Sequence, residues 1–412
     1  MTALIRRLQE SQLSVQALSR LASVAVFLLA SWADTHHVAL VALQGALLAV
    51  PYTLVEALVG RPQSAGIVPG DWDREAWAGR AAATVTLPVA VLGYVTVAVA
   101  LPHTGVLDRL LVVLPVLLQL PVEALFWAMT GTRTRRRANL VPQLVAAGTL
   151  LTAALFALTG VRLEAAAVPA QLAVLAWALG TRAPAPGRTR PGPLAAVRLG
   201  AAYCVAAAVD LVYVVALPAV AGALAGPAAI VVLRAMDLAF GPFHVALAAT
   251  TREDVVAGRG SRFRTGARLL TVLLLAGITV VVLAVPAVRG LLADALAAAS
   301  LTAVALYCAY KAAVMVSTWL STRHMIRATP GTYLASAMIA RAVAFAGLAV
   351  ALLRVRTTGD LFLQLAVCEI LVVAWFAVRL RTTTITTTAP RPSTTLAGPR
   401  EPRRPPQPQE RR

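Results

Sequence analysis

The chain has 412 residues, of which 59% are hydrophobic and 13% charged, and this balance excludes an ordinary soluble globular protein and indicates a polytopic membrane protein. The formal net charge of +19 also occurs in nucleic-acid-binding proteins. Here, however, the arginines lie in short loops and in the C-terminal tail, as the positive-inside rule describes, so we expect no nucleic-acid partner.

Apolar stretches of about the length that crosses a bilayer recur along the whole chain. We predict that they form about twelve transmembrane helices and that the fold is all-α. The predicted helices are Gln12–Ala33, Val38–Val59, Arg80–Leu101, Leu107–Thr130, Asn139–Thr159, Leu163–Leu179, Leu194–Leu217, Ala228–Thr250, Thr265–Val288, Leu296–Ser321, Thr332–Leu353 and Asp360–Leu380.

Arginines alternate between the predicted loops. Arg6 and Arg7 precede the first helix, and further arginines follow the second, fourth, sixth, eighth and tenth helices. The loops between them carry little net charge. Because basic loops stay on the cytoplasmic side of a membrane, this alternation predicts that both termini are cytoplasmic.

The first predicted helix has an alternative interpretation as a secretory signal peptide. Arg20 precedes an apolar run, and Ser31-Trp32-Ala33 resembles a cleavage site. Four polar residues nevertheless recur on one helical face, Gln12, Gln16, Ser19 and Ser23. Such a stripe is typical of a retained helix that lines a cavity, which is the interpretation we favour.

A segment rich in proline and arginine, Thr181–Pro193, cannot continue a helix and divides the chain in two. We predict an N-terminal six-helix bundle over residues 1–180, a cytoplasmic linker over 181–193 and a C-terminal six-helix bundle over 194–380. Residues 381–412 have few apolar side chains to bury, so we predict that they form a disordered cytoplasmic tail. Pro51 and Pro242 lie about midway along the second and eighth helices, which favours a repeated unit.

The eighth predicted helix carries the most unusual residues for a membrane segment. Arg234, Asp237 and His244 share one of its faces with Gly241. Since a charge facing hydrocarbon is costly, this face must contact protein or a water-filled cavity. Pro242 removes a backbone hydrogen bond and predicts a bend at a moving part.

Five other predicted helices carry polar or aromatic residues at helical spacing. These stripes are Gln44, Tyr52 and Glu56; Gln119, Glu123 and Trp127; Tyr203, Asp210 and Tyr213; Tyr307, Lys311, Thr318 and Ser321; and Tyr333 with Arg341. Their alignment indicates that the residues face the inside of a bundle.

Each charged residue also has a purely structural interpretation. Arg234 and Asp237 lie one turn apart, so an ion pair without a substrate role is supported equally well. Glu56 lies near the cytoplasmic end of its helix, where it can reach the interface, so we favour a structural or gating role. For Asp210 and Lys311, which lie nearest mid-helix, we favour function. For Glu123, in the fourth predicted helix, a structural and a functional role both stay open.

The sequence predicts no cofactor, no metal site and no catalytic residue. Cys204, Cys308 and Cys368 lie in apolar stretches, without a CxxC pair or a histidine at ligand spacing. They are typical of small buried hydrophobic residues. The sequence contains no nucleotide-binding or hydrolase motif, so we expect that the protein is not an enzyme.

Two segments resemble a known family. They are Leu43–Gln63, LQGALLAVPYTLVEALVGRPQ, and Ala225–Leu247, AGPAAIVVLRAMDLAFGPFHVAL. Both resemble helices of the polysaccharide exporters in the multidrug, oligosaccharidyl-lipid and polysaccharide (MOP) flippase superfamily, although His244 stands where relatives often have a smaller amide. The resemblance implies a MATE-like, V-shaped pair of six-helix bundles that open a central cavity to each side of the membrane in turn.

For function, the resemblance implies a flippase of the bacterial cytoplasmic (inner) membrane that moves a polyprenyl-diphosphate-linked oligosaccharide, a precursor of cell-surface polysaccharide. The expected partners are this lipid-linked glycan, membrane lipids and other polysaccharide-assembly proteins. A diphosphate needs cationic groups, and sugar rings stack on aromatic ones. The candidate substrate-binding residues are Arg20, Arg234, Lys311, Arg341, Tyr203 and Trp127. The candidate coupling or gating residues are Asp210, Asp237, Glu123, Glu56 and Pro242.

Two other functions stay open. A MATE-like, cation-coupled exporter of drugs or metabolites would use Glu123, Asp210 and Asp237, and would not favour Arg234 and Lys311 beside them. A membrane enzyme that uses polyprenyl-linked sugars would need acidic residues or a domain in its outer loops, which are short in this sequence.

Overall fold

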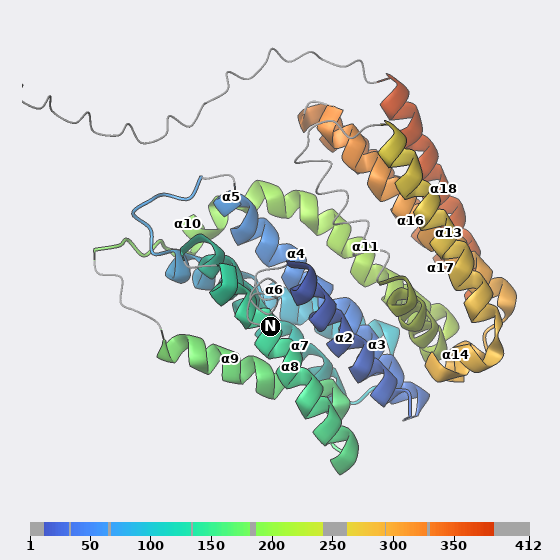
Figure 1. The fold of residues 1–412 in the computed structure, drawn as a ribbon, viewed down its shortest axis with the longest axis horizontal. Helices are drawn as coiled ribbons and strands as arrows, with labels where there is room; N and C mark the ends of the chain where they lie inside the picture. The colour runs from blue at the N-terminus through green and yellow to red at the C-terminus, as the bar shows by residue number, and fades with distance from the viewer. Residues whose placement is uncertain are drawn as a thin grey trace, which may run out of the picture.

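The computed structural model describes residues 12–32, 34–64, 67–132, 135–181, 187–241, 262–292, 294–327 and 330–382. Nearly all of these residues are helical, which confirms the predicted all-α fold (Figure 1). The extended pairing described is one isolated parallel bridge, between Trp72 and Thr189.

The helices of the N-terminal half follow the predicted apolar stretches. They are α2 (Gln12–Ala30), α3 (Thr35–Leu47), α4 (Ala49–Val55), the π-helix η1 (Glu56–Gly60), α5 (Arg61–Ser64), α6 (Arg74–Ala100), α7 (Val106–Thr132), α8 (Arg135–Thr159), the 3-10 helix η2 (Leu163–Ala165) and α9 (Val168–Gly180). From α3 to α5 these are turns of one membrane-length helix, Thr35–Gln63. Its first break, at Leu48, lies just before Pro51, which has no N–H to donate to the Leu47 carbonyl.

The helices of the C-terminal half are α10 (Pro193–Arg198), α11 (Ala201–Ala225), a helix over residues 227–241, α13 (Arg262–Ala284), α14 (Pro286–Leu292), α15 (Asp294–Ala297), α16 (Leu301–Arg327), α17 (Pro330–Arg354) and α18 (Thr358–Thr382). Each of the twelve predicted stretches is therefore helical over most of the part that the structure describes. The bend predicted at Pro242, and His244 beyond it, lie outside the described residues.

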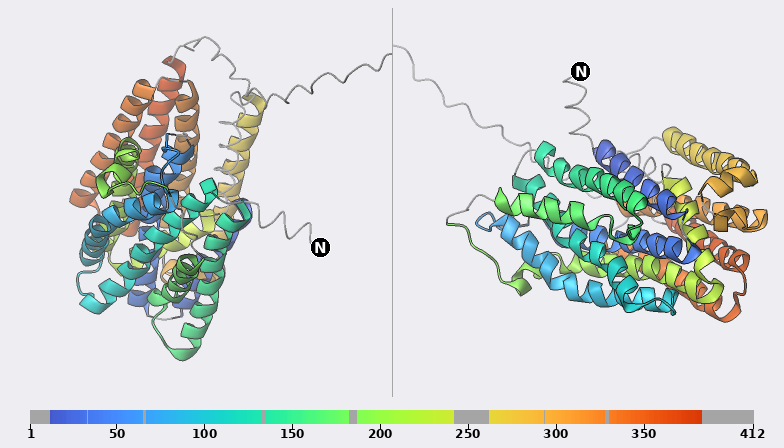
Figure 2. Two further views of the ribbon diagram at one scale, coloured as in Figure 1. Left: turned by 90° about the vertical axis from the view of Figure 1, so that its left-hand side faces the viewer. Right: turned by 90° about the horizontal axis from the view of Figure 1, so that it is seen from below.

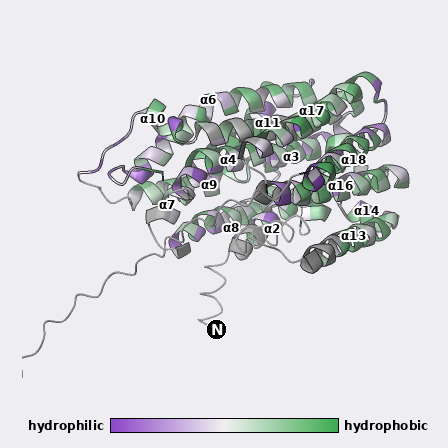
Figure 3. Cartoon of the chain, turned by 90° about the horizontal axis from the view of Figure 1, so that it is seen from above, coloured by the Kyte–Doolittle hydropathy of each residue, from purple (hydrophilic) through white to green (hydrophobic). Residues whose placement is uncertain are grey.

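Eight helical segments of the described chain are long and apolar enough to cross a membrane, as expected of a multi-pass membrane protein. They are Thr35–Gln63, Arg74–Ala100, Val106–Thr130, Arg137–Thr159, Leu163–Gly180, Leu301–Ser321, Thr332–Arg354 and Thr358–Thr382. Three shorter apolar segments add Leu18–Ala30, Val215–Ala225 and Leu273–Ala284. Figure 3 shows hydrophobic residues along most of the helices, with hydrophilic ones gathered in the loop beside α10.

Helix α11 contacts both halves of the chain. The helices from α2 to α9 pack on one another, and so do α13, α16, α17 and α18, whereas α11 contacts α4, α6 and η1 as well as α17 and α18. Glycine allows the close approach, because a Cβ at Gly222 would overlap the Ala100 carbonyl of α6 and one at Gly200 would meet Leu58 of η1. The division into bundles over 1–180 and 194–380, with a linker and a tail, stays a prediction.

The second part of the predicted linker is attached to the start of α6. Thr189 donates its N–H to the Asp71 carbonyl at 2.9 Å, and its own carbonyl accepts from the Asp73 N–H at 2.9 Å. The buried indole of Trp77 donates to the Ala196 carbonyl at 2.9 Å. The loop between the second and third predicted helices therefore positions the entry into α10.

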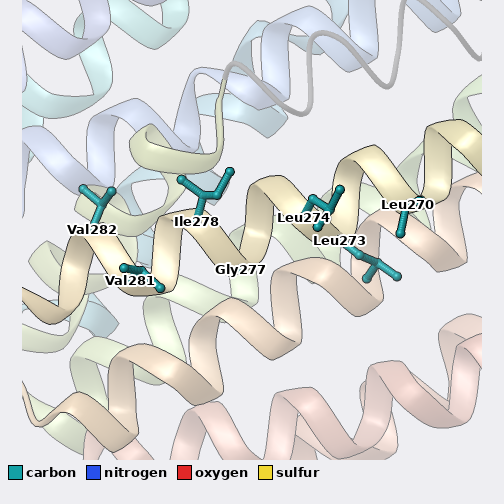
Figure 4. Close-up of a pocket in the computed structure, with 7 residues that line it drawn as sticks. All are labelled: Leu270, Leu273, Leu274, Gly277, Ile278, Val281 and Val282. Carbon is teal, nitrogen blue, oxygen red and sulfur yellow. The ribbon is translucent and has the colours of Figure 1, made fainter.

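Helix α13 lies at the edge of the molecule in both views of Figure 2. One of its faces forms a shallow apolar depression, which Figure 4 shows, lined by Leu270, Leu273, Leu274, Gly277, Ile278, Val281 and Val282. Val281 is 70% exposed and Leu274 58%. A face this apolar and this exposed is suited to contact with lipid rather than water.

Candidate functional site

Asp237, Tyr307 and Lys311 form the most closely bonded group of charged and polar side chains between helix 227–241 and α16. Tyr307 donates its hydroxyl to Asp237 Oδ1 at 2.6 Å, and Lys311 Nζ forms an ion pair with the same oxygen. Lys311 Nζ also lies 5.4 Å from the ring centroids of both Tyr307 and Tyr310. Asp237 therefore forms its ion pair with Lys311 of α16. Arg234, one turn away, interacts with Asp237 electrostatically but does not form the ion pair with it that the purely structural interpretation of the sequence offered.

Arg234 reaches the N-terminal half instead. Its Nη2 donates to Ser23 Oγ of α2 at 2.5 Å, and its guanidinium lies directly against Gly45 of α3. Arg20, an exposed residue of α2, lies close enough to interact electrostatically with Arg234 and with Tyr52 of α4. Among the described residues no carboxylate forms an ion pair with Arg234.

We call Arg20, Ser23, Arg234, Asp237, Tyr307 and Lys311 the charged cluster. Three of these side chains are cations and one is a carboxylate, so the cluster carries an excess of positive charge. Asp237 is 37% exposed although it lies in an apolar helix. Since charges that face hydrocarbon are costly, we expect this exposed surface to contact water between the halves.

A second polar group, in the N-terminal half, is built mainly from amides. Gln119 Nε2 donates to Glu123 Oε1 at 2.9 Å and to the Tyr52 hydroxyl at 3.4 Å. Gln171 Nε2 donates to Gln119 Oε1 and to the Pro115 carbonyl, both at 2.9 Å. Glu123 is 6% exposed and Tyr52 42%. Together with Gln44 we call these residues the amide network.

Gln44 explains how α7 tolerates a proline in mid-helix. Pro115 has no N–H to donate to the Leu111 carbonyl, which would otherwise be left without a partner. Gln44 Nε2 donates to Leu111 O at 3.4 Å and Val112 O at 3.2 Å, and it reaches Glu164 O at 2.7 Å. The buried amide of Gln44 thus satisfies backbone groups, which is a structural role.

Electrostatic contacts extend the charged cluster in both directions. On one side Tyr52 interacts with Glu123, and Glu123 with Glu56, whose carboxylate lies 3.5 Å from Arg61 Nε. On the other side buried Glu369 lies near both Lys311 and Arg341 and accepts a hydrogen bond from Ser317. The candidate residues that these contacts connect are Arg20, Arg234, Lys311, Arg341, Asp237, Glu123 and Glu56.

The other candidates are not in this group. Trp127 packs its indole against Gly60 of η1, with the Phe126 ring centroid 5.2 Å away. Tyr203 is half-buried near the start of α11. Asp210 lies in α11, but its side chain is outside the described part of the structure, as is Pro242. Cys308 and Cys368 are buried, as the sequence predicts, and Cys204 is half-buried.

No family model matches the sequence, and no curated protein matches it either. Solved structures do match. An outward-facing multidrug-resistance MATE family transporter of the MOP superfamily is 14% identical, with a TM-score of 0.54 over 92% of this chain and 95% of that chain. The lipid II flippase MurJ, in an inward closed conformation, is 11% identical, with a TM-score of 0.60 over 90% of this chain and 88% of that chain.

A MATE in complex with MaD3S is similar too, at 15% identity and a TM-score of 0.53, over 92% of this chain and 95% of that chain. This chain has the fold of MATE and MurJ transporters. The fold expected from the resemblance is confirmed, while membership of the polysaccharide exporters stays a prediction.

Within this MATE-type fold, three residues outside the predicted site hold the charged cluster together. The sequence placed Ser23 and Tyr307 on polar helical faces, three residues after Arg20 and four before Lys311, but assigned neither to the site. Gly45 gave no such signal, because its importance comes from a side chain that approaches from the other half. Chemically, the cluster is suited to bind an anion between the two halves.

Proposed function

We propose that this protein is a transporter that flips a polyprenyl-diphosphate-linked oligosaccharide across the cytoplasmic membrane by alternating access, with both termini in the cytoplasm. The observation that carries the proposal is the excess of positive charge in the charged cluster, where Lys311 is paired with Asp237, the cluster's one carboxylate, and lies near Glu369, while Arg20 and Arg234 form no ion pair with a described carboxylate. Each phosphate of a diphosphate diester carries about one negative charge, as in nucleic acid. The two negative charges of such a diphosphate match the two arginines, Arg20 and Arg234, that Asp237 does not pair with.

The physical setting strengthens this match. Cations within apolar helices are costly unless an anion or water accompanies them. An arginine guanidinium binds phosphate oxygens in a planar, two-pronged geometry, and a low dielectric strengthens that bond. Arg234 has only the neutral Ser23 hydroxyl as its described hydrogen-bond partner, and Asp237, which attracts it, is already paired with Lys311, so other N–H groups of Arg234 can bind cargo.

The fold supports transport by two alternating states. Structures with this fold include an outward-facing MATE and an inward closed MurJ, which is a lipid II flippase. In this chain α11 packs against both halves, which connects the two groups of helices. A membrane-embedded cationic site between halves is what a flippase for an anionic headgroup requires.

Deletion of the gene in its host tests the proposal. Membrane lipids extracted from the deletion strain and from the parent are compared by mass spectrometry. We expect a polyprenyl-diphosphate glycan to accumulate in the deletion strain, and its mass to identify the cargo. Unchanged lipid intermediates and intact surface glycan, in a strain that lacks every other flippase of this fold, would refute the proposed function.

A cation-coupled exporter of drugs or metabolites is the second candidate, because Glu123 is a buried carboxylate that interacts with Tyr52, a residue that is partly exposed. An organic cation would use this acid and would be repelled by Arg234. The two functions therefore predict opposite results. Glu123→Gln would abolish export of a cationic drug while Arg234→Ala increased it, whereas flipping of an anionic lipid would depend on Arg234.

A further inference from the structure

Arg234 is the residue of the charged cluster that crosses from one half of the chain to the other. Its backbone belongs to helix 227–241, but its guanidinium is bonded to α2 and packed on α3. Helix α2 also supplies Arg20, which interacts electrostatically with Arg234. The two arginines therefore come from different halves and meet at one place.

A side chain at Gly45 would meet the end of the Arg234 side chain, which would have to move. A Cβ built on Gly45 would lie 2.7 Å from Arg234 Nη2 and 2.8 Å from both Cζ and Nε. Real Cβ atoms essentially never approach heavy atoms this closely. Because the three distances are nearly equal, the planar guanidinium lies flat over the glycine backbone. Ser23 then fixes the rotation of the guanidinium with a hydrogen bond of 2.5 Å to Nη2. A planar cation held by its face and by one edge has its remaining N–H groups free to donate to a ligand.

We propose that Ser23 and Gly45 form a seat that positions Arg234 beside Arg20, and so complete a subsite for a diphosphate group. This inference rests on the proposed function and names two positioning residues for it. The subsite exists only while the halves are docked at this point, because separation of α2 and α3 from helix 227–241 removes Arg234 from Arg20. Cargo therefore binds the docked state more tightly than the separated one, and differential affinity of this kind is what lets a ligand shift a conformational equilibrium.

Binding of farnesyl diphosphate to the purified full-length protein in lipid nanodiscs tests the seat. Gly45→Ala displaces the guanidinium from its place over the glycine backbone, and we expect affinity to fall about tenfold. Ser23→Ala leaves the glycine seat intact, so a fall of about threefold is expected. The matched control is Gly277→Ala in α13, where an added Cβ meets open space, and it should bind as the wild type does.

The conservative variant Arg234→Lys provides a background in which the effect of Gly45→Ala on binding should disappear. A lysine ammonium on a slim stem lacks the planar group that collides with an added Cβ, so Gly45→Ala should cost nothing further in this background. Equal binding by Arg234→Lys and by the double variant supports the seat. A fall of the same size in both backgrounds, or Gly45→Ala binding as tightly as the wild type, overturns it.

A second readout needs no ligand. Thermal unfolding should show that Gly45→Ala raises Tm less in the wild type than in an Arg234→Ala background, because alanine favours helix α3 in both while only the wild type has a guanidinium to displace. Equal changes of Tm in the two backgrounds overturn the seat. If the wild type fails to bind farnesyl diphosphate, the proposed function is wrong, while the Tm comparison still decides whether Gly45 seats Arg234.

Discussion

The amide network and the charged cluster are both polar groups among apolar helices, but they are bonded in different ways. In the network Gln44 and Gln171 donate to backbone carbonyls of α7, and Gln119 links the side chains. In the cluster most partners are other side chains, with one bond from the Tyr307 hydroxyl to the Leu233 carbonyl, and the two arginines form no ion pair with a described carboxylate. The network satisfies backbone carbonyls of one helix, whereas the cluster has uncompensated positive charge that a ligand can neutralise.

This difference separates structural polarity from functional polarity inside a membrane. A buried amide that satisfies a carbonyl one turn before a proline lowers the cost of the missing backbone hydrogen bond, and nothing more is needed to explain the amide. An excess of cations has no such internal explanation, since it lowers stability unless an anion binds. Substitutions in the two regions should therefore affect different measurements.

Lys311→Ala should have the largest effect. It leaves Asp237 with Tyr307 as its remaining close partner, and an uncompensated buried charge costs several kcal/mol. Because Asp237 is 37% exposed, we expect about 2 to 3 kcal/mol of lost stability, together with loss of flipping in a lipid-transport assay. Removing both charges, in Lys311→Ala with Asp237→Ala, should restore Tm but not transport. Restored transport in the double variant would mean that the pair is purely structural.

Arg234→Ala should come next and should act mainly on binding. A hydrogen bond to a charged group contributes about 1.5 to 3 kcal/mol, so affinity for a diphosphate lipid should fall about 10- to 100-fold. Its described partner Ser23 is neutral and the cluster loses one excess cation, so Tm should stay the same or rise. Isothermal titration and thermal unfolding of the same preparation measure both. A large drop in Tm with unchanged affinity would place Arg234 with the structural residues.

Gln44→Leu probes the other region and should show the reverse pattern. It leaves the Leu111 and Glu164 carbonyls without their amide donor, at a cost of about 1 to 3 kcal/mol of stability. Affinity for the diphosphate lipid should stay within about twofold of the wild-type value, an effect as small as that of most substitutions away from a site. Gln44→Glu is the companion variant, because it keeps the shape but loses the donor. Weakened binding at unchanged Tm would contradict the structural role.

The smallest effect concerns pH at the far end of α16. His324 lies beyond the membrane span Leu301–Ser321, is buried, and has Nε2 at 3.1 Å from Ser336 Oγ. Burial, and then the charge of Arg379, lower the pKa of His324 below its ordinary value of 6.5. The folded state thus binds fewer protons than the unfolded state. The stability that neutral His324 contributes is therefore fully present above about pH 6.5 and is lost as the pH falls below that value.

Thermal unfolding between pH 7.5 and 5.5 measures this contribution. The wild type should lose Tm over that range, and His324→Asn should lose less. Equal slopes for the two proteins would mean that another group carries the pH dependence.

The sequence predicts the fold well because the bilayer restricts the choice of structure. Apolar length alone locates the helices, and the stripes at helical spacing place Arg234, Asp237 and Lys311 toward the interior. The sequence does not predict which charges pair, since Asp237 is one turn from Arg234 but bonds to Lys311 on another helix. Nor does it predict Gly45, because an absent side chain matters only once the approaching group is known. Spacing describes one helix, whereas the site is formed between helices.

Affinity for farnesyl diphosphate, compared with farnesyl monophosphate and farnesol, tests the central claim most directly. The three probes share one apolar chain and differ in the number of phosphate groups, and purified full-length protein in nanodiscs can be titrated with each. A diphosphate site predicts tightest binding for the diphosphate, weaker binding for the monophosphate, little for the alcohol, and loss of the preference at high salt. Equal affinity for all three would show that the charged cluster does not bind the cargo's phosphates.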